Sequence, residues 1–243
     1  MRLVPRMLFI ILPAVLLTAC STASDSTAPV SPVSGPTKVI NAGISGNTSG
    51  QLLARLDRDA LSKEPDAVVI MVGTNDRLNS HSFTDSKTYR RNVEALVSRI
   101  LSNRVGVVLV TPPTCIDRFL LTRHDPKHFA SQSPTQRMKE VRRIVLDIAR
   151  KRGVGLVDFH QYLTENRLGD ERATSLLRNP ANSGTKDGVH LTPNGSRRLA
   201  ELVAAELKRK GLNKGTIVCF GDSITLGSRT ANYPAFLQDI LSR

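Results

Sequence analysis

The sequence predicts an α/β fold in which five parallel strands form one doubly wound sheet flanked by helices. Five short β-rich runs alternate with segments of helical periodicity, and several runs are apolar almost throughout, as expected of parallel strands that are covered on both faces. Strands that alternate with helices are joined by right-handed crossovers, which build such a sheet. The five runs are residues 38–42, 67–73, 105–111, 154–159 and 216–220.

The helices are predicted from apolar residues that recur three and four positions apart, a spacing that places them on one helix face. Four segments show this spacing, and each lies between two of the strands. Their apolar positions are Leu52, Leu53 and Leu56; Val93, Leu96, Val97 and Ile100; Met138, Val141, Val145 and Ile148; and Leu199, Leu202 and Val203. Residues 112–134 and 161–185 are less regular, and long loops beyond strand ends are where such folds carry their functional sites.

The composition is that of a globular protein with a basic surplus. Hydrophobic residues make up 40% of the 243 residues and charged residues 23%, which excludes a mostly disordered chain. Lysine and arginine outnumber aspartate and glutamate by 34 to 21, for a net charge of +13. Such a surplus attracts nucleic acid, anionic lipid or acidic glycans. The chain has no tryptophan and no basic run interleaved with aromatic residues, so we expect no binding to nucleic acid.

The first 20 residues have the features of a secretory signal. Arg2 and Arg6 precede the apolar run 7–17, which is too short to span a bilayer as a helix. The run ends in Leu-Thr-Ala-Cys, which resembles the lipobox of bacterial lipoproteins and implies that Cys20 becomes the lipidated N-terminus of the mature protein. An ordinary signal peptide with an incidental cysteine is the alternative.

Residues 21–37 are rich in serine, threonine and proline, and Asp25 carries their only acidic or basic side chain before Lys38. This composition predicts a solvated tether rather than part of a core. Ser21 stands where an aspartate would suggest retention in the inner membrane, so the resemblance favours the outer membrane, facing the periplasm or the exterior. We therefore expect a signal peptide over 1–20, a tether over 21–37 and one folded domain over 38–243.

A serine follows the last predicted strand. Residues 216–227 read Thr-Ile-Val-Cys-Phe-Gly-Asp-Ser-Ile-Thr-Leu-Gly, a buried strand that runs into a turn flanked by glycines. Ser223 is therefore expected at the start of a helix that continues through 233–241, where free backbone N–H groups face developing negative charge. Capping of the helix by the serine hydroxyl is the alternative, and it is a frequent role of serine at such a position.

Three further segments carry the side chains that a serine nucleophile needs. In Asp-Gly-Val-His at 187–190, Asp187 is spaced to orient His190, which would take the proton from the serine hydroxyl. Gly43 follows the first strand and Asn75 the second, and both are candidates to form an oxyanion hole with the N–H of Ser223. A lone Asp-x-x-His is more often a solvated surface loop, so the prediction depends on the combination.

Together, the four segments resemble the four blocks of the SGNH (GDSL-type) hydrolase superfamily of esterases and lipases. Residues 221–225 resemble the nucleophile block, 41–49 the glycine block, 73–76 the asparagine block and 187–190 the last block. The resemblance implies a flavodoxin-like sheet. It also implies Ser223 as nucleophile, His190 as base and Asp187 as the residue that orients it, with Ser223, Gly43 and Asn75 as oxyanion donors.

The order of the blocks differs from that family, in which the nucleophile block comes first. Here it comes last, so residues 38–243 resemble a circular permutant in which 211–215 join the former ends. Such a join is feasible because domain termini commonly lie close together at the surface. A catalytic triad is defined by geometry rather than by chain order. The resemblance implies that the fifth strand lies between the first and the second, in the spatial order first, fifth, second, third, fourth.

We predict a carboxylic ester hydrolase that works through an acyl-enzyme and uses no metal or cofactor. Short connections and few aromatic residues favour short acyl groups, such as acetyl, on carbohydrate or small esters at the cell envelope. The alternatives are a lysophospholipase or thioesterase for longer chains, and a basic lipoprotein that binds envelope polymers without turnover. His124 and His128 could suggest a metal site, but no third ligand is evident.

Overall fold

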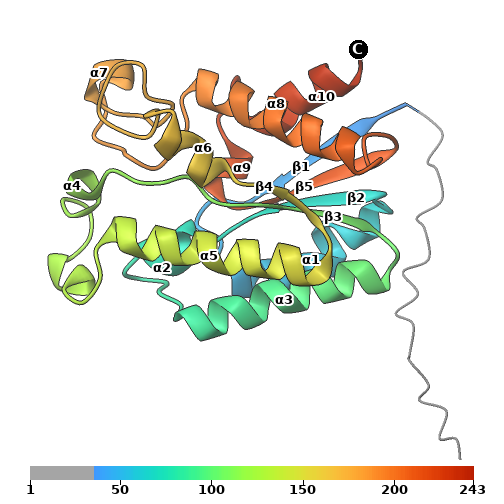
Figure 1. The fold of residues 1–243 in the computed structure, drawn as a ribbon, viewed down its shortest axis with the longest axis horizontal. Coiled ribbons are helices and arrows are strands. Elements are labelled where there is room, and N and C mark those ends of the chain that lie inside the picture. Colours follow the sequence, from blue (N-terminus) through green and yellow to red (C-terminus); the bar gives the residue numbers. More distant parts are fainter. Residues whose placement is uncertain (1–35) are drawn as a thin grey trace, which may run out of the picture.

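The computed structural model describes residues 36–243, so Cys20, the predicted signal and most of the predicted tether lie outside the described residues. Within them, five parallel strands form a single sheet (Figure 1). The strands are β1 (Lys38–Gly43), β2 (Ala67–Met71), β3 (Gly106–Val110), β4 (Gly155–Val157) and β5 (Thr216–Gly221). All five predicted strands are confirmed, with ends that differ from the prediction by two residues or fewer.

The strand order β1-β5-β2-β3-β4 confirms the predicted insertion of the fifth strand between the first two. β5 pairs in parallel with β1 on one side, where Lys38 lies opposite Thr216, and with β2 on the other, where Met71 lies opposite Gly221. Because β5 has neighbours on both sides and helices on both faces, its apolar side chains from Ile217 to Phe220 are fully buried. The strand that leads to Ser223 is thus a central part of the core.

Two layers of helices cover the sheet (Figure 1). One layer contains α1 (Ser49–Asp59), α3 (Ser86–Ser102) and α5 (Pro134–Arg152), and the other contains α8 (Pro193–Arg209) and α10 (Tyr233–Leu241). Every apolar position that predicted these helices is buried or partly buried. The shorter elements are α2 (Thr74–Leu78), α4 (Asp117–Leu120), α6 (Phe159–Glu165), α7 (Pro180–Ser183) and α9 (Ser223–Leu226), with 3-10 turns η1 (Leu61–Lys63) and η2 (Pro126–Phe129).

The long helices begin at side chains that cap them. Thr48, Ser133 and Thr192 each accept a hydrogen bond from a backbone N–H in the first turn of α1, α5 and α8. Proline at the first position of α5 and α8 costs no hydrogen bond there, because that N–H has no partner within the helix. Gly153 ends α5 in the left-handed conformation, with φ at 64°. Local sequence therefore sets these boundaries.

The predicted helix from Ser223 through residue 241 is wrong, because the segment forms two helices. α9 ends at Leu226, and Gly227 follows with φ at 62° and ψ at −155°, which does not continue a helix. The side chain of Asn232 closes the loop by donating to the carbonyl oxygen of Ser228, and its oxygen caps α10 by accepting the N–H of Ala235. α10 thus starts anew on the far side of a short loop.

The last helix returns to the beginning of β1. The N–H of Val39 donates to Oε1 of Gln238 at 2.7 Å, and Nε2 of Gln238 donates to the carbonyl oxygen of Thr37 at 3.0 Å. The N–H of Lys38 donates to the carbonyl oxygen of Gly215, just before β5. The C-terminal helix and the connection 210–215 therefore meet at the start of β1. Within residues 36–243, no helix is long and apolar enough to cross a membrane.

Candidate active site

Three of the predicted site residues meet at the carboxyl end of the sheet. Ser223 begins α9 directly after β5, and its Oγ lies 3.0 Å from Nε2 of His190. Nδ1 of His190 lies 2.9 Å from Oδ2 of Asp187. The imidazole therefore stands between the hydroxyl and the carboxylate, which is the arrangement by which a histidine takes a proton from a serine nucleophile.

The carboxylate of Asp187 is held by backbone as well as by the imidazole. Its Oδ1 accepts the N–H of Val189 at 3.0 Å and the N–H of His190 at 2.9 Å. Burial raises the pKa of Asp187, but the hydrogen bonds from the His190 side chain and from these N–H groups outweigh that effect, so the pKa lies well below its usual range. An ionised Asp187 favours the tautomer with the proton on Nδ1, which leaves Nε2 free to accept the serine proton.

The loop that carries Asp187 and His190 is fixed by backbone pairing with the segment before it. The N–H of Arg178 donates to the carbonyl oxygen of His190 at 2.9 Å, and the N–H of Gly188 donates to that of Arg178 at 2.8 Å. Leu177 and Leu191 form an antiparallel bridge there, and both side chains are buried. The long irregular stretch of the sequence thus forms the support for the histidine.

Asp222 lies buried between the nucleophile and the candidate asparagine. Its Oδ1 accepts the N–H of Ile224 at 2.9 Å and so caps α9, and its Oδ2 lies 3.5 Å from Nδ2 of Asn75. Burial raises the pKa of Asp222 to about 7. Among the described residues nothing accepts a hydrogen bond from the N–H of Ser223. That N–H is available to a negatively charged oxygen at the nucleophile.

The structure does not bring Gly43 into this group. Gly43 is the last residue of β1, and its N–H donates to Oδ1 of Asn41 at 3.0 Å. The amide of Asn41 is itself held by the carbonyl oxygen of Leu226, which accepts from its Nδ2 at 3.1 Å. The predicted role of Gly43 as an oxyanion donor is therefore corrected, because its N–H already has an acceptor.

Gly46, three residues further along the chain, is an alternative candidate for this donor. It lies in an exposed turn with φ at 79°, and nothing in the described part of the chain accepts from its N–H. The same turn touches Asn75, whose Nδ2 donates to the carbonyl oxygen of Asn47 at 3.1 Å, and Ser45 lines the same cavity as Ser223. A signal was present in the sequence, since Ser-Gly-Asn is typical of a turn.

Arg55 also supports the site and was not identified from the sequence. It is 6% exposed on α1, where its Nε donates to Oδ1 of Asn47 at 2.7 Å and its Nη2 donates to the carbonyl oxygen of Gly221 at 2.9 Å. Its guanidinium lies 4.3 Å from the centre of the Phe220 ring. Arg55 therefore ties the turn after β1 to the end of β5.

Asn75 is positioned by the residues around it at the start of α2. Asp76 is fully buried and accepts hydrogen bonds from the N–H and the hydroxyl of Ser49 at 3.0 and 2.5 Å. Gly73 has φ at 132°, and a Cβ there would meet the hydroxyl of Tyr89 at 2.9 Å. Only glycine lets β2 turn directly into α2, so the placement of Asn75 depends on this residue.

Ser223 borders two cavities of different size. The larger, of about 310 Å³, has a mixed lining beside His190 and Ser223: the polar residues include Ser45, Arg178, Ser196 and Ser228, and the apolar ones include Leu191, Ile224 and Leu226. The smaller, of about 90 Å³, is lined by Asn75, Leu78, Leu120 and His124, again beside His190 and Ser223. The guanidinium of Arg178 forms no ion pair within residues 36–243. A separate hollow of about 900 Å³ along α5 contains none of the candidate catalytic residues.

Comparison with known proteins identifies the class. Residues 23–198 match the GDSL-like lipase/acylhydrolase family, and this span is more than half of the chain. The chain therefore belongs to the GDSL-like lipase/acylhydrolase family, which confirms the predicted resemblance. Membership in a family of acylhydrolases supports the predicted carboxylic ester hydrolase.

The particular relatives include an acetylxylan esterase of Geobacillus stearothermophilus, 34% identical over 84 residues that cover 31% of this chain and 37% of that protein. The chain thus spans little more than a third of this relative. The uncharacterized lipoprotein YqeF of Bacillus subtilis strain 168 is 25% identical over 179 residues, 69% of this chain and 72% of that one.

Solved structures show the same fold. The lipase/acylhydrolase of Enterococcus faecalis matches with a TM-score of 0.53 and 24% identity, over 68% of this chain and 72% of that one. The acetyl xylan esterase AlAXEase matches with a TM-score of 0.52 and 25% identity, over 68% of this chain and 78% of that one. The predicted α/β fold with helices on both faces of a parallel sheet is thereby confirmed.

Proposed function

We propose that this protein is a serine ester hydrolase with Ser223 as nucleophile, His190 as general base and Asp187 as the residue that orients it. The observation that carries the proposal is the continuous hydrogen-bonded chain from Oγ of Ser223 through the imidazole to the carboxylate of Asp187. His190 takes the hydroxyl proton as Oγ attacks the acyl carbon, and it returns the proton to the leaving alcohol when the ester C–O bond breaks. Water, activated by the same imidazole, then releases the acid from the acyl-enzyme.

The oxyanion of the tetrahedral intermediate would be held by three donors. These are the free N–H of Ser223, the free N–H of Gly46 in place of that of Gly43, and the hydrogen of Asn75 Nδ2 that is not donated to Asn47 and has only a long contact of 3.5 Å with Asp222. All three belong to segments that follow neighbouring strands, β5, β2 and β1. Donors fixed in this way stabilise the charge that develops in the transition state without having to reorganise.

The two cavities favour a short acyl group on a polar alcohol. The smaller cavity, of about 90 Å³, has room for an acetyl group beside Ser223 and favours it over a long chain. The larger cavity offers a sugar hydroxyl groups and the guanidinium of Arg178, beside apolar side chains such as Leu191 and Leu226. We therefore favour acetylated carbohydrate or small acetyl esters, and the relatives named as acetylxylan esterases support this choice. A lysophospholipase or thioesterase would need more apolar room, and a binding protein without turnover would not need the triad.

A graded series of esters tests the proposal. Initial rates on acetyl, butyryl and octanoyl esters of one chromogenic alcohol, and on acetylated xylo-oligosaccharides, should fall as the acyl chain lengthens. Ser223→Ala should lose roughly a thousandfold or more in kcat/KM while its circular dichroism spectrum stays unchanged. Turnover like the wild type in that variant would contradict the nucleophile. Rates that rise with chain length would contradict only the short acyl group.

The envelope location is a further part of the proposal. We propose a lipoprotein with its signal over 1–20, lipidation at Cys20 and a tether over 21–37, held at the outer membrane. The run Leu-Thr-Ala-Cys supports it, and so does the relative that is called a lipoprotein.

We also propose that residues 38–243 are a circular permutant of the family's usual order. Three observations support this: the nucleophile follows the last strand, the family match ends at residue 198 before β5, and Gln238 of the last helix is hydrogen-bonded to Thr37 and Val39 at the first strand. A rearranged chain tests it. That chain would start near Gly215, join Arg243 to Lys38 through a short Gly/Ser linker and end near Gly211.

The rearranged chain should hydrolyse the same esters. Loop closure changes only slowly with length, so its free energy of unfolding should differ by on the order of 1 kcal/mol from that of the parent. The matched control, deletion of 223–243, should be inactive because it removes the nucleophile and the helix after it. A chain that stays unfolded with linkers of several lengths would contradict the permutation and leave the nucleophile assignment standing.

A further inference from the structure

Basic residues gather where the chain enters the strands. The five stretches are residues 36–38, 60–66, 102–105, 151–154 and 210–215, of which the first ends in β1 and the third and fourth begin in the last turns of α3 and α5. Because the strands are parallel, all five lie at the same end of the sheet. They contain seven basic residues, Lys38, Lys63, Arg104, Lys151, Arg152, Lys210 and Lys214, against two acidic residues, Glu64 and Asp66. We call this surface the basic end.

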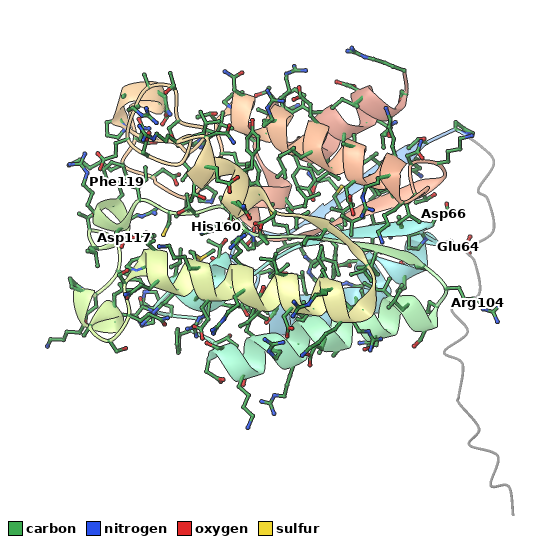
Figure 2. All side chains as sticks on the ribbon, in the orientation of Figure 1. Glu64, Asp66, Arg104, Asp117, Phe119 and His160 are labelled. Carbon is green, nitrogen blue, oxygen red and sulfur yellow. The ribbon has the colours of Figure 1, made fainter. Side chains whose placement is uncertain are left out.

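Most of these cations are exposed and free of acidic partners. Lys38, Lys63, Arg104, Arg152 and Lys214 are all exposed, and none of them forms an ion pair within residues 36–243. One of the two acids is engaged, since Asp66 accepts the N–H of Thr216 at 2.7 Å. Arg104 and Glu64 lie at the outer edge of this end (Figure 2). The basic end therefore presents its charge to the surroundings.

The catalytic end carries no such surplus. The segments between the end of each strand and the next long helix are 44–48, 72–85, 111–133, 158–192 and 222–232. They contain ten acidic and nine basic residues, against two and seven at the basic end. The protein is thus polarised along its strands, with positive charge concentrated at the end farthest from Ser223.

We propose that the basic end is a membrane-binding face that contacts the headgroups of anionic phospholipids and points the active site away from the bilayer. β1 begins at this end, so the chain before residue 38 enters here (Figure 1). Seventeen residues, 21–37, separate Cys20 from Lys38 in the sequence. A lipid on Cys20 would therefore hold the basic end close to the membrane surface, where basic residues are attracted to anionic lipid.

The orientation has a consequence for the substrate. β5 is six residues long and therefore places Ser223 about 20 Å farther from the membrane than the basic end. The nucleophile would then face polymers and small esters outside the bilayer rather than the lipids of the bilayer itself. The proposed membrane binding does not depend on the proposed hydrolase activity, because none of the seven cations borders the cavities at Ser223.

Vesicle binding tests the proposal without the lipid anchor. A mature chain that starts at Ser21 keeps every described helix and strand and lacks the signal and Cys20. It should cosediment with vesicles of phosphatidylcholine and phosphatidylglycerol at about 0.1 M salt, and not with phosphatidylcholine alone. The triple variant Lys63→Gln, Arg104→Gln and Lys214→Gln should bind roughly a hundredfold more weakly, at about fivefold per cation.

A triple variant of equal charge change at the other end is the matched control. Lys127→Gln, Lys186→Gln and Arg229→Gln alter exposed residues of loops at the catalytic end and should bind vesicles as the parent does. Hydrolysis of a soluble ester by the basic-end variant should stay within twofold of the parent. Equal loss of binding in both triple variants would overturn the proposal. So would binding of the parent to phosphatidylcholine alone, or to an acidic polysaccharide but to neither kind of vesicle.

Discussion

Asp222 should make the protein less stable as the pH rises from 5 to 8. Its carboxyl is 1% exposed, and burial raises its pKa to about 7, although the N–H of Ile224 and the nearby His190 favour the ionised form. The pKa of an aspartate in the unfolded chain is about 3.9. At intermediate pH the native carboxyl therefore holds a proton that the unfolded chain has released.

The sign and size of the effect follow from that difference. Because the native carboxyl binds the proton more tightly, the contribution of Asp222 to the free energy of unfolding is largest below pH 4 and falls until the pH exceeds the native pKa. A gap of about three pKa units corresponds to about 4 kcal/mol over the whole range, and about 3 kcal/mol of it falls between pH 5 and pH 8. Burial also raises the pKa of Asp76, which acts in the same direction, whereas burial lowers the pKa of His124, His128 and His160, which acts against it.

Asp222→Asn tests this reasoning. An asparagine keeps an oxygen that can cap α9 through the N–H of Ile224, and it cannot ionise. The free energy of unfolding is measured by chemical denaturation at pH 5 and at pH 8. Its change between these two pH values should be more negative by about 3 kcal/mol in the parent than in the variant. Asp239→Asn, an exposed carboxyl on α10, is the matched control and should fall as the parent does. Equal falls in the parent and in Asp222→Asn would refute the assignment of the pH dependence to Asp222.

Three further predictions concern the oxyanion, the alcohol and the anchor. Asn75→Ala should lower kcat by roughly 10²–10³ with a smaller change in KM, and an unchanged kcat would remove Asn75 from the oxyanion hole. Arg178→Gln should raise KM several times more for an acetyl ester with a carboxylate on its alcohol than for the neutral ester. The reason is that the Arg178 guanidinium lines the larger cavity without an acidic partner among the described residues. An equal rise in KM for both esters would contradict that role. Cys20→Ala in the full chain should move the protein from the membrane fraction to the soluble fraction in about 1 M salt, which screens the attraction of the basic end to lipid, and unaltered partitioning in that salt would exclude anchoring through Cys20.

The strands and long helices could be predicted from the local sequence, because each element buries apolar residues whose spacing can be read from the sequence. β5 is apolar from Ile217 to Phe220 because it is central, and α5 shows its buried stripe in every turn. The position of β5 between β1 and β2 has no local signal and followed only from the resemblance. The break between α9 and α10 was missed, although Asn232 before Pro234 is a typical start of a helix.

The site could be predicted where a motif carries it and not where distant segments meet. The proposed triad follows from two short motifs. The choice of Gly43 failed because β1 continues to Gly43, one residue beyond the predicted strand, and the Gly43 N–H donates to the side chain of Asn41. Arg55 could not be found at all. It is an arginine on an amphipathic helix, and its contact with Gly221 joins residues 166 positions apart.

The arrangement of strands explains why the site does not depend on where the chain begins. β5 lies between β1 and β2, the chain after β5 runs into α10 on one face, and the chain after β1 runs into α1 on the other. Such a change of direction opens a crevice at the carboxyl ends of the strands, and Ser223 and Asn75 stand on its two sides. Thr37, Gln238 and the connection 210–215 all lie at the opposite end of the sheet. Moving the chain ends there leaves every hydrogen bond of the proposed triad in place, so the proposed circular permutation is compatible with the candidate site.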